Sequence, residues 1–195
     1  MRGSDPKADL QRYLQEARDA MLWKLDGLSE YDIRRPLVPT ATNLLGLVKH
    51  LTHVEFVYFG ATFGRPPAEK LPWSPEDPLS DMYAAVGESR DYITGLYKKA
   101  WAHSDVTIEA LALDAPGLVP HWRGDRSAVT LHRIMVHVIA ESHRHAGHAD
   151  IVRELIDGAA GLQQDRGNLP SESADWWVDQ RSRVERAARQ AAADG

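Results

Sequence analysis

The longest helical pattern in the sequence, residues 130–156, carries two polar residues where apolar ones are expected. On a helical wheel with about 100° per residue, Glu141 and His145 fall inside the apolar stripe of this segment. The stripe consists of Leu131, Ile134, Val138, Ala149 and Ile156. Because an unpaired polar group in a core is costly, a carboxylate and an imidazole one turn apart on this face require polar partners from another helix. This requirement limits the possible folds more than any other feature of the chain.

A helix predicted over residues 42–61 offers such a partner. Its apolar stripe comprises Leu44, Leu47, Leu51, Val54 and Tyr58. His50 lies at the edge of this stripe and His53 lies further toward solvent, so His50 is the better candidate for an inward-facing imidazole. Two imidazoles and a carboxylate that converge from two helices can bind a divalent cation. Three protein ligands leave coordination positions open, which is typical of a catalytic site.

Other interpretations of these residues remain open. Glu141 and His145 could form a buried hydrogen-bonded pair that binds no metal. His137 with Glu141, or His145 with His148, could also belong to a ligand set. His137 and His148 are in addition the candidate catalytic residues, either as general bases or as groups that hydrogen-bond a ligand. The ligand types favour zinc, while nickel, iron, cobalt and manganese also accept them.

Amphipathic periodicity predicts an all-α fold. We expect further helices at residues 6–26, at residues 80–102 and from residue 173, the last one outside a four-helix core. Five prolines between residues 63 and 78 exclude regular structure there, and this connection is long enough to cross over a bundle. Residues 103–126 are irregular with room for a short strand, and no convincing pair of alternating strands appears. The chain is expected to form one domain, 1–195, with a C-terminal helical extension at 171–195.

Charge and cysteine content narrow the possible functions. Lys and Arg total 23 against 28 Asp and Glu, so the formal net charge is −5, and the dispersed basic residues argue against nucleic-acid binding. No apolar run approaches the ~20 residues of a membrane span. Residues 1–6 lack the apolar core of a signal peptide, so a cytoplasmic location is expected. Because the chain has no cysteine, any thiol chemistry must use a thiol that a substrate brings.

Candidate contacts to a small-molecule substrate precede the histidine-rich helix. Arg123 could bind a carboxylate or phosphate, and Trp122 could pack against the same ligand. An ordinary solvated loop is an equally good interpretation of this segment, because neither residue lies in a periodic pattern.

Two segments resemble the DinB-like superfamily of metal-binding proteins. Residues 44–51, LLGLVKHL, with Glu55 after them, look like its second helix, and residues 130–150 look like its metal-bearing fourth helix. The HAGHAD sequence at residues 145–150 and the pair Trp176–Trp177 are most similar to an actinobacterial branch of mycothiol-dependent transferases. The resemblance covers nearly the whole chain.

This resemblance implies a four-helix bundle with a divalent metal bound by His50, Glu141 and His145. The family contains transferases and isomerases that use low-molecular-weight thiols such as mycothiol or bacillithiol. It therefore implies a thiol S-transferase that acts on a small electrophile, and it makes a homodimer an expectation. A metal-dependent hydrolase that uses a metal-bound water is one alternative. A non-catalytic metal- or ligand-binding stress-response protein is the other.

Overall fold

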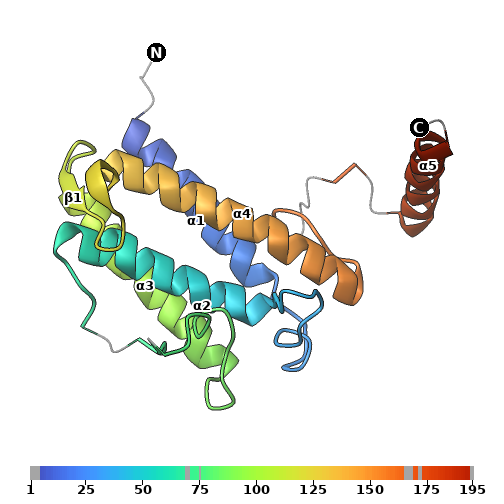
Figure 1. Cartoon of the computed structure of the whole chain (residues 1–195), viewed down its shortest axis with the longest axis horizontal. Coiled ribbons are helices and arrows are strands. Elements are labelled where there is room, and N and C mark those ends of the chain that lie inside the picture. The colour runs from blue at the N-terminus through green and yellow to red at the C-terminus, as the bar shows by residue number, and fades with distance from the viewer. Residues whose placement is uncertain (1–4, 69–70, 75, 165–168, 171–172, 194–195) are drawn as a thin grey trace. The chain divides into compact units, whose positions relative to one another are not determined.

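Four helices form the first part of the chain in the computed structural model. They are α1 (Pro6–Trp23), α2 (Leu44–Glu55), α3 (Arg90–Ala110) and α4 (Leu131–Asp157), and Figure 1 shows them side by side. The structure describes residues 5–68, 71–74, 76–164, 169–170 and 173–193. Together with a helix near the C-terminus, these elements confirm the predicted all-α bundle.

The chain divides into two compact units, residues 1–160 and 161–195. The second unit contains α5 (Ala174–Ala193), where a helix was predicted from residue 173. In α5, the rings of Trp176 and Trp177 meet edge to face with their centroids 4.7 Å apart. Two ranges named in the sequence analysis lie outside the described residues. They are residues 1–4, near the N-terminus, and residues 171–172, at the predicted start of the C-terminal extension. No helix in the described ranges has the length and apolar composition needed to span a bilayer.

Contacts between helix ends show the direction in which each helix runs relative to its neighbours. Helix α1 packs beside α4, and α2 packs beside both α3 and α4. Near the end of α4, Arg153 donates hydrogen bonds to the carbonyls of Lys24 and Asp26 just after α1, so α1 and α4 run in the same direction. Lys7 at the start of α1 donates to the carbonyl of Leu111 just after α3, so these two helices are antiparallel.

The connection between α2 and α3 returns along the length of the bundle. Lys49 in α2 pairs with Glu88 just before α3, whereas Phe56 at the end of α2 packs with Ala100 in α3. The two helices are therefore parallel, and residues 64–89 must cross back between their opposite ends (Figure 1). This explains why the connection is long and rich in proline, which cannot extend either helix.

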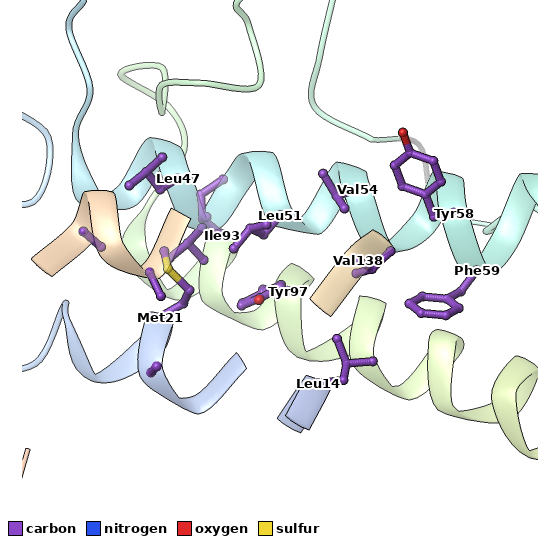
Figure 2. Packing of buried hydrophobic residues seen from close by; sticks show 14 of the residues in the cluster. Leu14, Met21, Leu47, Leu51, Val54, Tyr58, Phe59, Ile93, Tyr97 and Val138 are labelled. Atoms are coloured by element: carbon purple, nitrogen blue, oxygen red, sulfur yellow. The ribbon is translucent and has the colours of Figure 1, made fainter. Parts of the chain in front are cut away.

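Apolar side chains from all four helices meet between them (Figure 2). Buried examples are Leu14, Met21, Leu47, Leu51, Val54, Ile93, Tyr97 and Val138. Burying one leucine or isoleucine side chain contributes about 1.5–3 kcal/mol relative to leaving it in water. The buried residues follow the helical periodicity of the sequence, so hydrophobic burial decides which face of each helix points inward.

The prediction for the third helix was wrong at both ends. Helix α3 begins at Arg90 rather than at residue 80, and it ends at Ala110 rather than at residue 102. Ser89 caps it by accepting a hydrogen bond from the backbone N–H of Tyr92. Val86, an apolar residue inside the predicted range, is fully exposed. The sequence pattern was misread because the turns before Ser89 contain apolar residues at near-helical spacing.

The structure has a short strand within residues 103–126, where the sequence left room for one, and it has a strand pair that the sequence pattern did not reveal. Strands β1 (Pro116–Leu118) and β2 (Ala128–Thr130) pair in antiparallel fashion between α3 and α4. Three-residue strands are too short to show a recognisable alternation. Thr130 then caps α4 by accepting a hydrogen bond from the backbone N–H of Arg133, and Gly158 ends this helix in a left-handed conformation.

A buried ion pair joins three helices at the centre of the bundle. Arg18 of α1 makes two parallel hydrogen bonds, of 2.8 and 2.7 Å, to the carboxylate of Glu55 in α2. A third bond, of 2.9 Å, reaches Asp105 in α3. The Arg18 and Glu55 side chains are 2% and 1% exposed, so water cannot solvate either charge. Burial raises the pKa of Glu55 and the Arg18 guanidinium opposes this shift.

We expect Arg18→Met to lower the free energy of unfolding by about 3–5 kcal/mol, because it leaves the Glu55 carboxylate buried without a counter-charge. The double variant Arg18→Met/Glu55→Leu should recover most of this loss, since an apolar pair needs no partner. Urea unfolding followed by circular dichroism measures both changes.

The matched control for this experiment is Arg12→Met, which removes an exposed arginine of the same helix that pairs with Glu16. Its unfolding midpoint should match that of the unaltered protein. An Arg18→Met variant as stable as this control would contradict a central role for the buried pair.

Candidate functional site

Three potential metal ligands meet where α2 passes α4. They are His50 of α2 with Glu141 and His145 of α4, and their ligand atoms all lie within 4.8 Å of one another. The Glu141 Oε1 atom is 3.0 Å from His145 Nε2 and 3.7 Å from His50 Nε2. The side chains of His50, Glu141 and His145 are 22%, 27% and 7% exposed. The cluster therefore lies at the rim of the core, where a small molecule can reach it.

The chemistry of this cluster suits a divalent cation. Two donor atoms that each lie about 2.1 Å from a tetrahedral ion are about 3.4 Å apart, and the two measured separations lie on either side of this value. Burial lowers the pKa of His145, with the neighbouring His50 adding to the shift, so its imidazole is neutral near pH 7. Burial opposes ionisation of Glu141, but the adjacent His145 imidazole lowers the pKa of this carboxyl overall. Neutral imidazoles and an ionised carboxylate are the forms that bind metals.

Asp81 holds His50 from the side opposite to the cluster. Its Oδ2 atom lies 2.8 Å from His50 Nδ1 and 3.4 Å from His53 Nδ1. Burial opposes ionisation of Asp81, but the hydrogen bonds from the two histidines hold the pKa of its carboxyl well below the usual range. A carboxylate on Nδ1 fixes the proton there, so the Nε2 atom of His50 keeps its lone pair toward Glu141.

Close packing of the α2–α3 connection against α2 brings Asp81 into place. A Cβ atom on Gly46 would lie 1.9 Å from the carbonyl oxygen of Met82, so only glycine permits this approach. The Asn43 side chain donates a hydrogen bond to the same carbonyl. Sequence analysis did not single out Asp81, because it lies in an irregular segment 31 residues from His50. No periodic signal could have found it.

The two candidate catalytic histidines lie on different sides of the cluster. His137 lines a cavity of about 470 Å³ next to His50 and Glu141. Burial lowers the pKa of His137, so its imidazole is neutral near pH 7. His148 instead contacts His145 from behind, with 3.3 Å between the two Nδ1 atoms, and lines a separate cavity of about 330 Å³.

The larger cavity has an aromatic wall that sequence analysis found only in part. Its lining residues are His50, His53, Val54, Val57, Tyr58, Asp81, His121, His137 and Glu141. Trp122 packs behind this wall, with ring centroids 5.1 Å from His137 and 5.9 Å from Tyr58. Arg123 is exposed and does not line the cavity. Sequence analysis did not single out His121, which only the folded connection before α4 brings beside Tyr58.

Comparison with solved structures shows the fold. A structure described as a conserved protein from Enterococcus faecalis superposes with a TM-score of 0.59, covering 80% of this chain and 100% of that chain at 15% sequence identity. A search of curated proteins finds no match to the sequence.

Comparison with protein families shows where the chain belongs. The model of a family described as Mycothiol-S-transferase matches residues 9–158. This range contains the whole four-helix bundle from Asp9 onward, including both histidine segments that suggested a DinB-like protein. Because the match spans most of the chain, the protein belongs to the mycothiol-S-transferase family, a DinB-like family.

Proposed function

We propose that this protein is a divalent-metal-dependent S-transferase that activates mycothiol, or a closely similar low-molecular-weight thiol, toward a small electrophile. The observation that carries the proposal is the meeting of His50, Glu141 and His145, because His50 and Glu141 also line a cavity of about 470 Å³. Membership of the mycothiol-S-transferase family supports the choice of thiol.

Each part of the site has a defined role in this proposal. His50, Glu141 and His145 hold the cation, and zinc suits a set of two imidazoles and one carboxylate. A bound divalent cation lowers the pKa of a coordinated thiol, so that thiolate is present near neutral pH. The nucleophile comes from the cosubstrate, because the chain has no cysteine. The cavity beside the cluster receives the electrophile.

The two remaining histidines differ in what they can touch. His137 faces the cavity and is neutral near pH 7, so it can accept the proton that the thiol loses or hydrogen-bond the electrophile. Of the three proposed ligands, His148 contacts His145, through the Nδ1 atoms of the two rings. His148 is therefore a positioning residue in this proposal.

Metal content tests the ligand set. After loading with zinc and desalting, elemental analysis should find close to one equivalent in the unaltered protein. His50→Ala and His145→Ala should each retain only a trace, because two remaining ligands hold zinc weakly. The control is His132→Ala, which alters an exposed histidine of α4. It should bind as much zinc as the unaltered protein does. Trace metal in all four proteins, also after loading with nickel, iron, cobalt or manganese, would refute the metal site.

Asp81→Asn tests the support of His50. We expect zinc affinity to fall about 10- to 100-fold, because the hydrogen bond that orients a ligand histidine is weakened. Competition against a chromophoric chelator measures this change. Asp77→Asn, in the same connection and in contact with Tyr83 rather than with the cluster, should leave the affinity unchanged. Equal affinities of the two variants would show that Asp81 has no such role.

Dependence on thiol tests the reaction. Zinc-loaded protein should consume an electrophile only when mycothiol is present, at a rate that rises with its concentration, and His145→Ala should abolish this turnover. Chromatography of the thioether product gives the rate. Electrophile loss without thiol would favour the hydrolase alternative, and binding without any turnover would favour a non-catalytic protein.

A further inference from the structure

Two carboxylates, Asp81 and Glu141, line the cavity beside the metal cluster, and the other ionisable groups of its lining are imidazoles and the phenol of Tyr58. Both carboxylates accept hydrogen bonds from histidine side chains, Asp81 from His50 and Glu141 from His145. Burial lowers the pKa values of His121 and His137, so both are neutral near pH 7. Neither lysine nor arginine occurs among the described residues that line this cavity. The guanidinium of Arg133 contacts the Trp122 ring behind the wall.

This charge distribution selects against an anionic electrophile. A carboxylate or phosphate that enters a partly desolvated cavity needs a counter-charge. Without one, no electrostatic attraction offsets the free energy that the anion loses with its hydration shell. The cation proposed for the cluster would already be offset by Glu141 and by the thiolate. Asp81, the second carboxylate of the lining, would then repel a further negative charge.

Tyr58 offers the cavity a hydrogen-bond donor. It lies in the π-helical turn η1 (Phe56–Gly60) that follows α2, and its ring packs against His137 at 4.7 Å between centroids. The Thr62 hydroxyl donates to the carbonyl of Val57 and so stabilises the wider turn. Figure 2 shows the Tyr58 hydroxyl turned away from Phe59 and Val138, on the side opposite to the core.

The hydroxyl of Tyr58 has a polar contact that a ligand can replace. The Trp122 ring packs edge to face against the Tyr58 ring, with 5.9 Å between the centroids. Among the described residues, its hydrogen-bond partner is Nε2 of His121, at a long 3.3 Å, and the carbonyl oxygen of a ligand can take the place of this nitrogen as the acceptor. Burial raises the pKa of Tyr58, so the phenol stays protonated and suits donation of a hydrogen bond more than transfer of a proton.

We propose that this cavity binds an uncharged electrophile with a carbonyl group conjugated to its reactive carbon, and that the Tyr58 hydroxyl donates a hydrogen bond to the carbonyl oxygen. This proposal rests on the S-transferase function proposed above. In the reaction, the thiolate sulfur forms a bond to the β-carbon, and the electron pair of the C=C bond moves to give an enolate. The hydrogen bond from Tyr58 stabilises the negative charge on the enolate oxygen. A proton from water then adds to the α-carbon, and the proton that the thiol lost has gone to solvent, so the net reaction is addition of the thiol across the double bond.

Tyr58→Phe tests the donor, with 4-phenyl-3-buten-2-one and mycothiol as substrates of the zinc-loaded protein. Loss of one donor to a developing oxyanion should lower kcat about 100-fold with little change in KM, because the charge forms only in the transition state. With benzyl chloride, whose chloride leaves without a proton or an oxyanion, the rate should stay within about twofold of the unaltered protein. Tyr92→Phe, an exposed tyrosine of α3, is the control for both substrates.

The same ketone with a para-carboxylate on its ring tests the charge preference. This group lies far from the reacting carbon, so the two compounds can be compared after division by their uncatalysed rates with mycothiol. We expect kcat/KM to be at least about tenfold lower for the carboxylate, because the cavity offers it no counter-charge. Equal or faster turnover of the carboxylate, or an unchanged kcat for Tyr58→Phe with the ketone, would overturn the proposal.

Binding of the unreactive ketone 4-phenyl-2-butanone separates this proposal from the S-transferase function. Calorimetry without thiol should show weaker binding to Tyr58→Phe than to the unaltered protein and Tyr92→Phe, and weaker binding of the para-carboxylate analogue to all three. Equal binding to every variant, or no binding at all, would overturn the proposed cavity ligand. Absence of mycothiol turnover in a protein that shows the expected binding series would overturn the S-transferase function alone.

Discussion

The bundle depends on one buried charge pair, Arg18 with Glu55. A carboxylate at this depth is tolerable only when a cation satisfies both of its oxygens, and Arg18 reaches it from another helix with two short hydrogen bonds. The pair therefore fixes the position of α1 along the axis of α2. The bond from Arg18 to Asp105 extends this constraint to α3. Because Glu55 lies on the same helix as His50, this register also determines where His50 meets α4.

The chain places two inward-facing carboxylates in opposite environments. Glu55 is fully enclosed and paired with a guanidinium, which leaves it no capacity for chemistry. Glu141 lies at the rim of the core, and its close partners are the imidazoles of His50 and His145. Imidazoles near neutral pH cannot compensate a carboxylate as a guanidinium does. The same apolar bundle thus contains one structural carboxylate and one that remains available to a cation.

The irregular connections complete the site from two directions. The α2–α3 connection crosses Gly46 closely enough to bring Asp81 behind His50. The segment before α4 brings His121 and Trp122 to Tyr58 on the other side of the cavity. The helices therefore position the proposed ligands, whereas the loops orient one ligand and line the space where a substrate would react. A change in the loops could therefore alter what the cavity accepts and leave the bundle intact.

Helical periodicity predicted the fold class and singled out the three polar residues that face inward, whereas the resemblance to the DinB-like superfamily selected them as the ligand set over the other combinations. A residue that faces a core repeats every three or four positions, so Glu141 and His145 stand out in their apolar stripe, and His50 stands out at the edge of its own. The start of α3 at Arg90, the contact of Asp81 with His50 and the separation of His137 from His148 needed the tertiary structure. Loop residues have no periodicity that reports their direction, and two positions on one face of a helix can still meet different neighbours. Contacts of that kind arise only when distant segments pack together.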